Sequence, residues 1–457
     1  MKKPQSHERN RKNTPSRNDS SQKHGPFQEK NAPKRSPHTT NYNTGRVISA
    51  GDQPHTEMRA GKSVELRVGK LIVGDGRVLD DARIGVEGGR FKEISDDRLE
   101  GSYGERLDLS DRIAMPGLFD AHVHVRYGPK SDPEPPSDEY QAIRSLMNAR
   151  KALRAGVTSL ADAGAIRNVA FAVKDAIENG IALGPRMFVS GEMITMTGGR
   201  SRRPGERLEV DGADSARRAA RGLLMYKGVD FIKLGATGAI SSPHTGPRHP
   251  QLTVEEMRAA TEEAHNCGKM VHAHCYGEAG ISNALEAGVD VIVHGQTLTE
   301  EHVRNMKERG LILLPTLKTF CGHLDHLGEG GVHDRIVTTG IWNETEPNFR
   351  NALASGVTIA MGTDAGMPDN LFGDNPRDLE YMVAWGMTPE QAIAAGTLNA
   401  ARSVGVEGKL GTVEEGKYAD LIILRDDPLQ EISAIRTSLE KIMLNGELYN
   451  PEDIPKY

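Results

Sequence analysis

Several of the chain's 16 histidines stand at the ends of apolar, strand-like runs rather than in its polar segments. His122 and His124 are two residues apart, and because residues i and i+2 of a strand point to the same side, both imidazoles aim at one point. Converging imidazole and carboxylate groups are a preferred ligand set for zinc-like divalent ions. The sequence therefore predicts a metal site made from strand ends, with the donors His122, His124, His274, His294 and Asp364.

A lysine lies near the end of another such run, and its charge conflicts with a metal site. Lys233, in the stretch FIKLG, would direct an ammonium group at a centre that already holds cations. Electrostatic repulsion opposes this arrangement unless the amine is neutral or chemically modified. His272 raises a second question, because it lies two residues before His274 and could face the same side of its strand.

These donors need a scaffold that brings distant strand ends together. Between residues 116 and 403 the sequence alternates strand-like runs with amphipathic helical runs, which predicts a (β/α)8 barrel, an α/β fold of the TIM type. The runs are rich in Val, Ile and Leu without strict alternation, as expected for strands buried on both faces. An open doubly wound sheet fits less well, because no glycine-rich phosphate turn follows the first run. The eight predicted strands are residues 117–124, 156–162, 186–191, 229–235, 269–275, 289–295, 311–317 and 356–364.

Both ends of the patterned sequence have a different character. Residues 61–115 alternate short strands with Asp-Gly and Gly-Gly turns, and residues 404–457 repeat this pattern. We expect one small, discontinuous β-sandwich domain assembled from both segments. Within the barrel, Thr253 and Thr388 begin capping-box sequences, with Pro389 in the first helical turn, so a helix is expected to start after each threonine.

The first 60 residues carry 12 basic and five acidic side chains, whereas the whole chain has a net charge of −6. Too few apolar residues occur in this segment to bury a core, so we expect a disordered basic tail. Nucleic-acid binding is not favoured, because no aromatic residues interleave with the charges and the rest of the chain is acidic. Met58 stands immediately before the patterned sequence and is an alternative functional start.

Other features of the sequence limit the protein's setting and class. We expect neither a cleaved secretory signal nor a membrane-spanning helix, because no secretory apolar core and no run of about 18 apolar residues occurs. The three cysteines show no paired spacing, so a reducing, cytoplasmic setting is expected. A non-catalytic metal-binding barrel is the alternative to an enzyme. It is disfavoured because the candidate donor set is complete, with Asp364 and Lys233 both present.

Five motifs, in order along the chain, resemble the metal-dependent amidohydrolase superfamily, specifically its imidazolonepropionase-like and Xaa-Pro-dipeptidase-like branch. They are MPGLFDAHVHV, FIKLGATGA, VHAHCYGEAGI, VIVHG and MGTDAG, and the resemblance spans residues 62–450. It implies that a CO2-derived carbamate on Lys233 bridges two divalent metal ions, which removes the charge conflict. The implied ligands are His122, His124 and Asp364 for one ion and His274 and His294 for the other, with His272 deeper in the barrel.

The same resemblance implies a hydrolase that cleaves an amide-type C–N bond with a metal-bridging hydroxide. Asp364 would orient the water, accept its proton and deliver it to the leaving nitrogen. Tyr276 occupies a position from which related enzymes present a hydroxyl to the scissile carbonyl, and an aromatic side chain packed on the rim is an equal alternative. Zinc is the expected metal, and Co2+ or Mn2+ would suit the same donors.

Guanidinium groups in two loops could bind a substrate carboxylate bidentately, and solvated surface loops without a binding role are the alternative. A dipeptide or an N-acyl amino acid fits best. A urea, carbamate or thiocarbamate xenobiotic, or a cyclic amide, is the alternative for the same binuclear site. A deaminase is less consistent with FIKLG, because deaminases of this superfamily usually lack the lysine, and the resemblance leaves a homo-oligomer open. The candidate substrate-binding residues are Arg200, His244 and Arg248.

Overall fold

The computed structural model describes residues 63–128, 137–199, 207–241, 245–324, 326–329, 332–367 and 369–456. The predicted basic tail at residues 1–60 and the alternative start at Met58 lie outside these ranges. Two of the three candidate substrate residues, Arg200 and His244, also lie outside them. None of the helices within the described ranges is both long enough and apolar enough to cross a bilayer.

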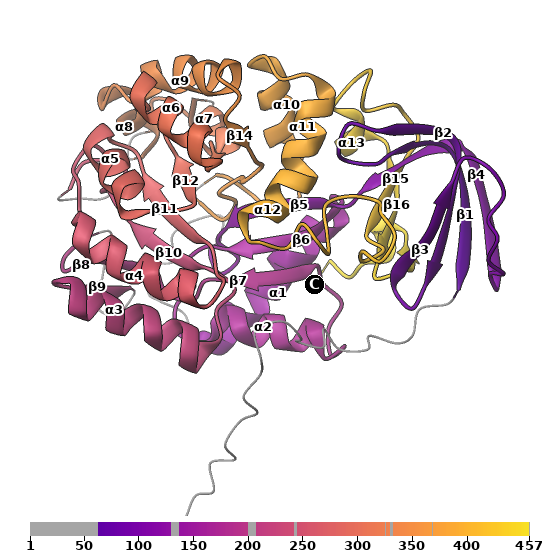
Figure 1. Cartoon of the computed structure of the whole chain (residues 1–457), viewed down its shortest axis with the longest axis horizontal. Coiled ribbons are helices and arrows are strands. Elements are labelled where there is room, and N and C mark those ends of the chain that lie inside the picture. The colour runs from indigo at the N-terminus through magenta and orange to yellow at the C-terminus, as the bar shows by residue number, and fades with distance from the viewer. Residues whose placement is uncertain are drawn as a thin grey trace, which may run out of the picture. The chain divides into compact units, whose positions relative to one another are not determined.

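Strands from both ends of the described chain pair in one seven-stranded sheet (Figure 1). The order β17-β16-β15-β4-β1-β2-β3 places the two segments side by side where β15 pairs antiparallel with β4. The prediction that both ends build one sheet structure is confirmed, and its sandwich form stays a prediction. The strands are β1 (Val64–Ile72), β2 (Val78–Glu87), β3 (Arg90–Ser95), β4 (Glu105–Pro116), β15 (Leu421–Leu424), β16 (Leu439–Leu444) and β17 (Glu447–Tyr449).

The alternation of side chains along β1 explains how this sheet forms its own core. Leu66 and Val68 are fully buried, whereas Arg67 between them points to the other face and pairs with Asp81 of β2 at 2.7 Å. The buried residues pack with Leu421 and Ile423 of β15, so the apolar faces of the N-terminal and C-terminal segments share one cluster.

All remaining strands belong to two parallel sheets. β5 (Leu118–Val123), β6 (Val157–Asp162) and β7 (Arg186–Val189) form one, and the other has the order β14-β13-β12-β11-β10-β8-β9. Each of the eight predicted strands is present within its predicted range. β8 and β9 were not predicted, because these three-residue strands are held by pairing, β8 with β10 and β9 with β8, rather than by a pattern of their own. The second sheet contains β8 (Ile194–Met196), β9 (Leu208–Val210), β10 (Ile232–Gly235), β11 (Val271–Cys275), β12 (Val291–His294), β13 (Ile312–Leu314) and β14 (Thr358–Ile359).

Backbone hydrogen bonds connect the two parallel sheets on both sides. Between β7 and β10, Asp230 N donates to Val189 O at 2.9 Å. Between β5 and the chain after β14, Ala121 N donates to Met361 O at 3.0 Å. The carboxyl ends of β5 and β14, which are far apart in the sequence, therefore lie side by side.

Helices follow most parallel strands and lie outside the sheets in Figure 1. The helix starts predicted at Thr253 and Thr388 are confirmed, since both threonines form complete capping boxes. The helices are α1 (Asp138–Arg154), α2 (Val169–Glu178), α3 (Ala213–Arg221), η1 (Gly222–Lys227), α4 (Val254–Asn266), α5 (Glu278–Ala287), α6 (Glu300–Arg309), α7 (Leu317–Leu324), α8 (Val332–Thr338), α9 (Trp342–Ala354), α10 (Arg377–Ala384), α11 (Pro389–Ala394), η2 (Ala395–Asn399), α12 (Ala400–Ser403), α13 (Ala434–Thr437) and η3 (Pro451–Asp453).

The helix that starts after Thr388 differs from the regular helix that its pattern predicts. A π-helical segment, η2, separates α11 from α12. The carbonyl of Ala395 accepts a hydrogen bond from Met361 N, beyond the end of β14, at 2.9 Å. In a regular α-helix this carbonyl would accept a hydrogen bond from a later amide of the same helix. Such insertions into the ladder typically accompany single π-turns.

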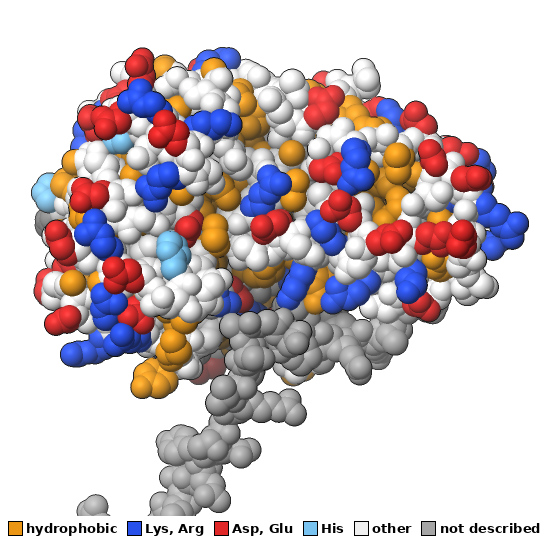
Figure 2. Space-filling view, viewed as in Figure 1, with side chains coloured by type: hydrophobic (Ala, Val, Ile, Leu, Met, Phe, Trp, Pro, Cys, Tyr) orange, Lys and Arg blue, Asp and Glu red, His pale blue; other side chains and the backbone are white. Residues whose placement is uncertain are grey.

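The face of the molecule shown in Figure 2 carries acidic and basic side chains in mixture. No extended patch of one charge is visible over the described elements on that face.

Gly366 provides a test of how closely the chain after β14 approaches β5. Its φ is +102°, and a Cβ there would stand 2.2 Å from the carbonyl oxygen of His124. We expect Gly366→Ala to lower the free energy of unfolding by about 3 kcal/mol or more, because backbone strain and a backbone clash add. Gly76 has a similar φ of +98° with open space around it, so Gly76→Ala should cost only about 1 kcal/mol. Equal losses in denaturant unfolding would contradict this close approach.

Candidate metal centre

The carboxyl ends of the parallel strands bring six polar side chains together. His122 lies on β5 and His124 directly after it, Lys233 lies on β10, and Asp364 follows β14. None of the six is more than 6% exposed, so each is removed from solvent and must find its partners inside the protein. The other two members are His274 on β11 and His294 at the end of β12.

His122, His124 and Asp364 have the geometry of a ligand set. Their ligating atoms all lie within 4.8 Å of one another. The Oδ1 atom of Asp364 is 3.5 Å from His122 Nε2 and 3.1 Å from His124 Nε2. Ligands about 2.1 Å from one tetrahedral ion stand roughly 3.4 Å apart, so these spacings fit three donors that share a zinc-like cation.

Electrostatics keeps this group in the state that binds metals. Burial and, secondly, the ammonium of Lys233 hold the pKa of His122 well below its usual value, against the pull of Asp364. Burial also lowers the pKa of His124. For Asp364, burial acts to raise the pKa, but hydrogen bonds from His122 and His124 outweigh it and hold the pKa well below the usual range. Neutral imidazoles and an ionised carboxylate are the forms that coordinate cations.

Neighbouring oxygens fix which nitrogen of His294 and of His274 carries the lone pair. Thr316 Oγ1 donates its proton to Pro315 O at 2.8 Å and so accepts from His294 Nδ1 at 2.8 Å, which leaves Nε2 of His294 as the lone-pair nitrogen. His274 Nε2 donates to Gly238 O at 3.1 Å, so its lone pair is on Nδ1. The two rings lie edge to face with centroids 4.6 Å apart. Outer hydrogen bonds of this kind orient metal-binding histidines.

Lys233 lies among these imidazoles rather than beside a surface carboxylate. Its Nζ is 3.5 Å from His122 Nδ1, and its charge contributes to the lowered pKa values of His122 and His272. An ammonium in this position repels the cations that the other donors would hold. The structure thus reproduces the conflict that the sequence predicts.

Three non-glycine residues of this region have left-handed backbone conformations. The φ values are +76° for His294, +54° for Thr316 and +58° for Asp364. Such conformations are costly for side chains with a Cβ, and they concentrate at functional sites where the surrounding structure enforces them. Here they turn the chain at the strand ends of the site.

Asp120 is a residue of this region that the sequence analysis missed. Its carboxylate accepts from Thr363 N at 2.9 Å, Thr363 Oγ1 at 2.6 Å and Asn375 Nδ2 at 2.7 Å, and from His122 N at 3.3 Å. It therefore ties β5 to the residue before Asp364. Its position two residues before His122, on the same side of the strand, was the available signal.

His272 on β11 and Tyr276 directly after it make several aromatic contacts. Tyr276 stacks on His294 with ring centroids 4.5 Å apart, meets His274 edge to face, and also contacts Phe320 of α7. His272 Nε2 donates to Ser403 O at 2.7 Å, and its ring lies against Phe231. Burial lowers the pKa of His272 to about 3. Tyr276 thus lies against the candidate ligands, whereas His272 is engaged with α12.

Arg248 is the one candidate substrate residue within the described ranges. It lines an open cavity of about 490 Å³ together with His249 and Thr339, and its guanidinium pairs with Glu344 of α9. This ion pair occupies part of the hydrogen-bonding capacity that a substrate carboxylate would need. The structure places Arg248 at the cavity and in this ion pair.

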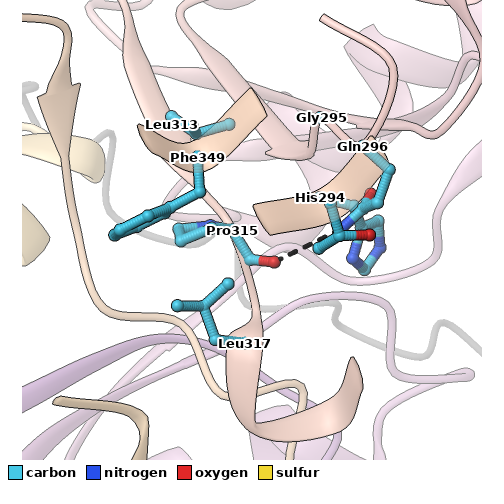
Figure 3. A pocket seen from close by; sticks show the side chains of 8 residues that line it. His294, Gly295, Gln296, Leu313, Pro315, Leu317 and Phe349 are labelled. Carbon is cyan, nitrogen blue, oxygen red and sulfur yellow. Dashed lines mark hydrogen bonds between the residues drawn. The ribbon is translucent and has the colours of Figure 1, made fainter. Parts of the chain in front are cut away.

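A small pocket also adjoins His294 (Figure 3). Leu313, Leu317 and Phe349 line it with apolar surface, and Gln296 Nε2 donates to Pro315 O at 3.5 Å across one side. Its lining is mainly apolar apart from His294 and Gln296, and we assign it no ligand.

Parallel β/α architecture, strand-end imidazoles and a carboxylate with cation-ligand spacing define a metal-dependent hydrolase. The chain belongs to the amidohydrolase family, whose profile matches residues 113–449. Within it the protein falls in the imidazolonepropionase-like branch and is a hydrolase of amide-type C–N bonds. The resemblance seen in the sequence is therefore confirmed.

Individual relatives agree with this placement. The chain is 29% identical over 426 residues to ochratoxinase of Aspergillus niger, which covers 83% of this chain and 85% of that protein. The crystal structure of ochratoxinase from A. niger superposes with a TM-score of 0.77 at 27% identity and covers 87% of this chain and 99% of that one. A Xaa-Pro dipeptidase with bound methionine in its active site also gives a TM-score of 0.77 at 30% identity, with 85% of this chain and 100% of that one covered.

Thr316 allows a test of the tautomer assignment at His294. Thr316→Val keeps the shape of the side chain but removes the oxygen that receives the Nδ1 proton of His294. We expect metal affinity to fall about 10- to 100-fold, the usual effect of losing such an outer hydrogen bond, in competition against a chelator. Thr397→Val removes a buried hydroxyl that donates to Ile393 O, so it serves as the matched control. An unchanged affinity in the Thr316 variant would contradict the assignment.

Proposed function

We propose that this protein is a binuclear, metal-dependent hydrolase that cleaves the amide bond of a dipeptide or an N-acyl amino acid. The observation that carries the proposal is the convergence of His122, His124 and Asp364, with His274, His294 and Lys233 beside them. Four imidazoles, a carboxylate and a lysine offer more donors than one tetrahedral ion needs, which favours two ions over one.

We further propose that the two parallel sheets form a closed (β/α)8 barrel spanning residues 116–403. The hydrogen bonds from Asp230 to Val189 and from Ala121 to Met361 support this, because they join the sheets on both sides. Residues 61–115 and 404–457 would form the small β-sandwich domain. In such barrels the active site lies at the carboxyl ends of the strands, where the candidate metal centre stands.

Each ion has its own proposed set of ligands. His122 Nε2, His124 Nε2 and Asp364 Oδ1 would hold the first, and His274 Nδ1 and His294 Nε2 the second. A CO2-derived carbamate on Lys233 would bridge them and turn a repelling ammonium into an anionic ligand. Zinc suits these donors best, and Co2+ or Mn2+ would also be accepted.

The residues of the chain provide the proton transfers. Divalent cations, when bound, polarise a carbonyl group and lower the pKa of water. Asp364 directs Oδ1 toward His122 and His124, which leaves Oδ2 as its second carboxylate oxygen. Oδ2 can therefore accept a proton from the attacking water and deliver it to the leaving nitrogen. Tyr276, whose ring stacks on His294, would donate its hydroxyl proton to the substrate carbonyl.

The choice of substrate class is supported by two relatives of similar length. One is a Xaa-Pro dipeptidase whose structure holds methionine, and the other is ochratoxinase. A dipeptide or N-acyl amino acid places a carboxylate next to the cleaved amide, so this class suits a site with cationic side chains around the metals. Ureas, carbamates, thiocarbamates and cyclic amides form the alternative class.

Asp364→Asn tests the proton-transfer role. The amide cannot hold the transferred proton, so we expect the fold to be retained and turnover to fall by about 10²- to 10⁴-fold or more. Asp369→Asn changes a half-exposed acid in the same loop and is the control. Turnover is measured on dipeptides, N-acyl amino acids and carbamates, together with metal content. Near-normal turnover in the Asp364 variant contradicts its role, and fewer than two metals per chain with no hydrolysis contradicts the proposed function.

The carbamate can be detected without measuring activity. Protein prepared with 13C-labelled bicarbonate should give a carbamate carbonyl signal in its 13C NMR spectrum. Lys233→Arg keeps a cation that cannot be carboxylated, so this signal should be absent and the metal content should fall below two per chain. Identical spectra for the two proteins would rule out the modification of Lys233.

A further inference from the structure

Asn370 closes the loop that carries Asp364, the proposed proton carrier. The backbone carbonyl of Asn370 accepts a hydrogen bond from Gly366 N at 2.9 Å, and its amide nitrogen donates to Met367 O at 3.0 Å. Met367 N in turn donates to Asp364 O at 3.3 Å. These three bonds fold the loop back on itself. Asn370 is 5% exposed, so its side chain also needs partners inside the protein.

The side chain of Asn370 holds Thr363, the residue directly before Asp364. Its Nδ2 donates to Thr363 O at 2.7 Å and also to Thr319 Oγ1 of α7. Thr319 Oγ1 itself donates to Thr363 O at 3.2 Å. The carbonyl of Thr363 therefore receives two hydrogen bonds, one from its own loop and one from α7.

A buried lysine determines which way the Asn370 amide points. Lys318 Nζ donates to Asn370 Oδ1 at 2.5 Å and to Leu371 O at 3.0 Å. An ammonium group has donors only, so the atom that faces it is the amide oxygen, and Nδ2 is left to face Thr363. The backbone amide of Lys318 donates to the buried Asp378 of α10 at 2.8 Å. This bond anchors the start of α7, from which the lysine extends.

The orientation of Thr363 decides where the carboxylate of Asp364 points. Asp120 binds N and Oγ1 of Thr363, whereas Asn370 and Thr319 bind its carbonyl. That carbonyl shares a rigid peptide plane with Asp364 N, so fixing one fixes the other. Asp364 has a φ of +58°, a left-handed conformation that an aspartate adopts at a cost. Without the contacts at the carbonyl this backbone can relax, and the carboxylate then moves away from its partners.

We propose that Asn370 is a positioning residue for Asp364, oriented by Lys318 of α7. The proposal rests on the proposed function and adds to it the contacts that hold the proton carrier in place. The carboxylate has two tasks, cation binding through Oδ1 and proton transfer through Oδ2, and both depend on its orientation. Asp120 supports the amide side of Thr363 from β5, and Asn370 supports its carbonyl side.

Asn370→Asp tests the proposal with almost no change of shape. The new carboxylate still accepts from Lys318, but it replaces the Nδ2 donor with an oxygen that repels Thr363 O. We expect kcat for a dipeptide to fall about 10- to 100-fold, the effect of a small misplacement of a catalytic group. KM should change little, because the contacts with the substrate are kept. Lys318→Met should also lower kcat, since the amide can then rotate.

The cobalt-substituted protein gives a readout that does not depend on turnover. Asp364 is a proposed ligand, so its displacement in Asn370→Asp should change the visible absorption of bound Co2+. It should also weaken Co2+ binding about 10- to 100-fold in competition with a chelator, the usual effect of disturbing an outer contact of a metal ligand.

Asn399→Asp is the matched control, because the same arrangement recurs there outside the Asp364 loop. Asn399 Nδ2 donates to Ile359 O at 2.9 Å, and its Oδ1 accepts from Arg402 Nη1 at 3.2 Å. The substitution removes an equivalent donor to a backbone carbonyl and keeps the cation. It should leave kcat and the cobalt spectrum unchanged.

Thr319→Val decides the matter if circular dichroism shows that Asn370→Asp does not fold. It keeps the shape of its side chain and removes the second donor to Thr363 O, so kcat and Co2+ affinity should fall, though less than in Asn370→Asp. Wild-type kcat together with a wild-type cobalt spectrum in the folded variants would overturn the proposal.

The two readouts separate this proposal from the proposed function. If the wild type hydrolyses a dipeptide and Asn370→Asp retains both kcat and the cobalt spectrum, the positioning role is rejected and the hydrolase stands. If the wild type hydrolyses no amide but Asn370→Asp changes the cobalt spectrum, the positioning role is supported and the proposed function is rejected.

Discussion

The contact between the end of β5 and the chain after β14 is the interaction on which the metal centre depends. Asp364 N donates to His122 O at 2.7 Å, and His124 N donates to Ala365 O at 2.8 Å. These bonds set the carboxylate of Asp364 against both imidazoles. Asp120 reinforces the same junction, because it binds Thr363 and the backbone of His122 from within the protein. Loss of this alignment would separate the donors even if every side chain remained in the sequence.

Burial keeps two histidines of the candidate metal centre neutral, because it lowers their pKa values. It also costs free energy, because these polar groups lose their hydrogen bonds to water. An unpaired polar group in a protein interior is expensive, so each buried donor has a defined partner or a defined ligand role. Thr316 and Gly238 receive one proton each from His294 and His274, which aims the remaining lone pairs. Lys233 Nζ lies 3.5 Å from His122 Nδ1, so its charge opposes the cations that the neighbouring donors favour.

The same region combines rigidity with local strain. Left-handed backbone at His294, Thr316 and Asp364 costs stability that packing elsewhere must supply. Close approaches such as that of Gly366 to His124 show how tightly the surrounding chain holds these conformations. Donors held this way need little reorganisation when cations and substrate bind, which is the usual basis of electrostatic preorganisation.

The sequence by itself determined the strand positions, the two capped helix starts and the candidate ligands. Each depends on local information: apolar runs, capping residues, and donors spaced two apart at strand ends. Tertiary structure alone decided which nitrogen of His274 and His294 is the lone-pair atom, because Gly238 and Thr316 come from other segments. It also decided that Asp120 supports the site, that the helix after Thr388 contains a π-helical segment, and that Arg248 pairs with Glu344. Arg126 and Arg207 belong to the same class, since 80 intervening residues separate two side chains whose meeting at Tyr127 no local pattern encodes.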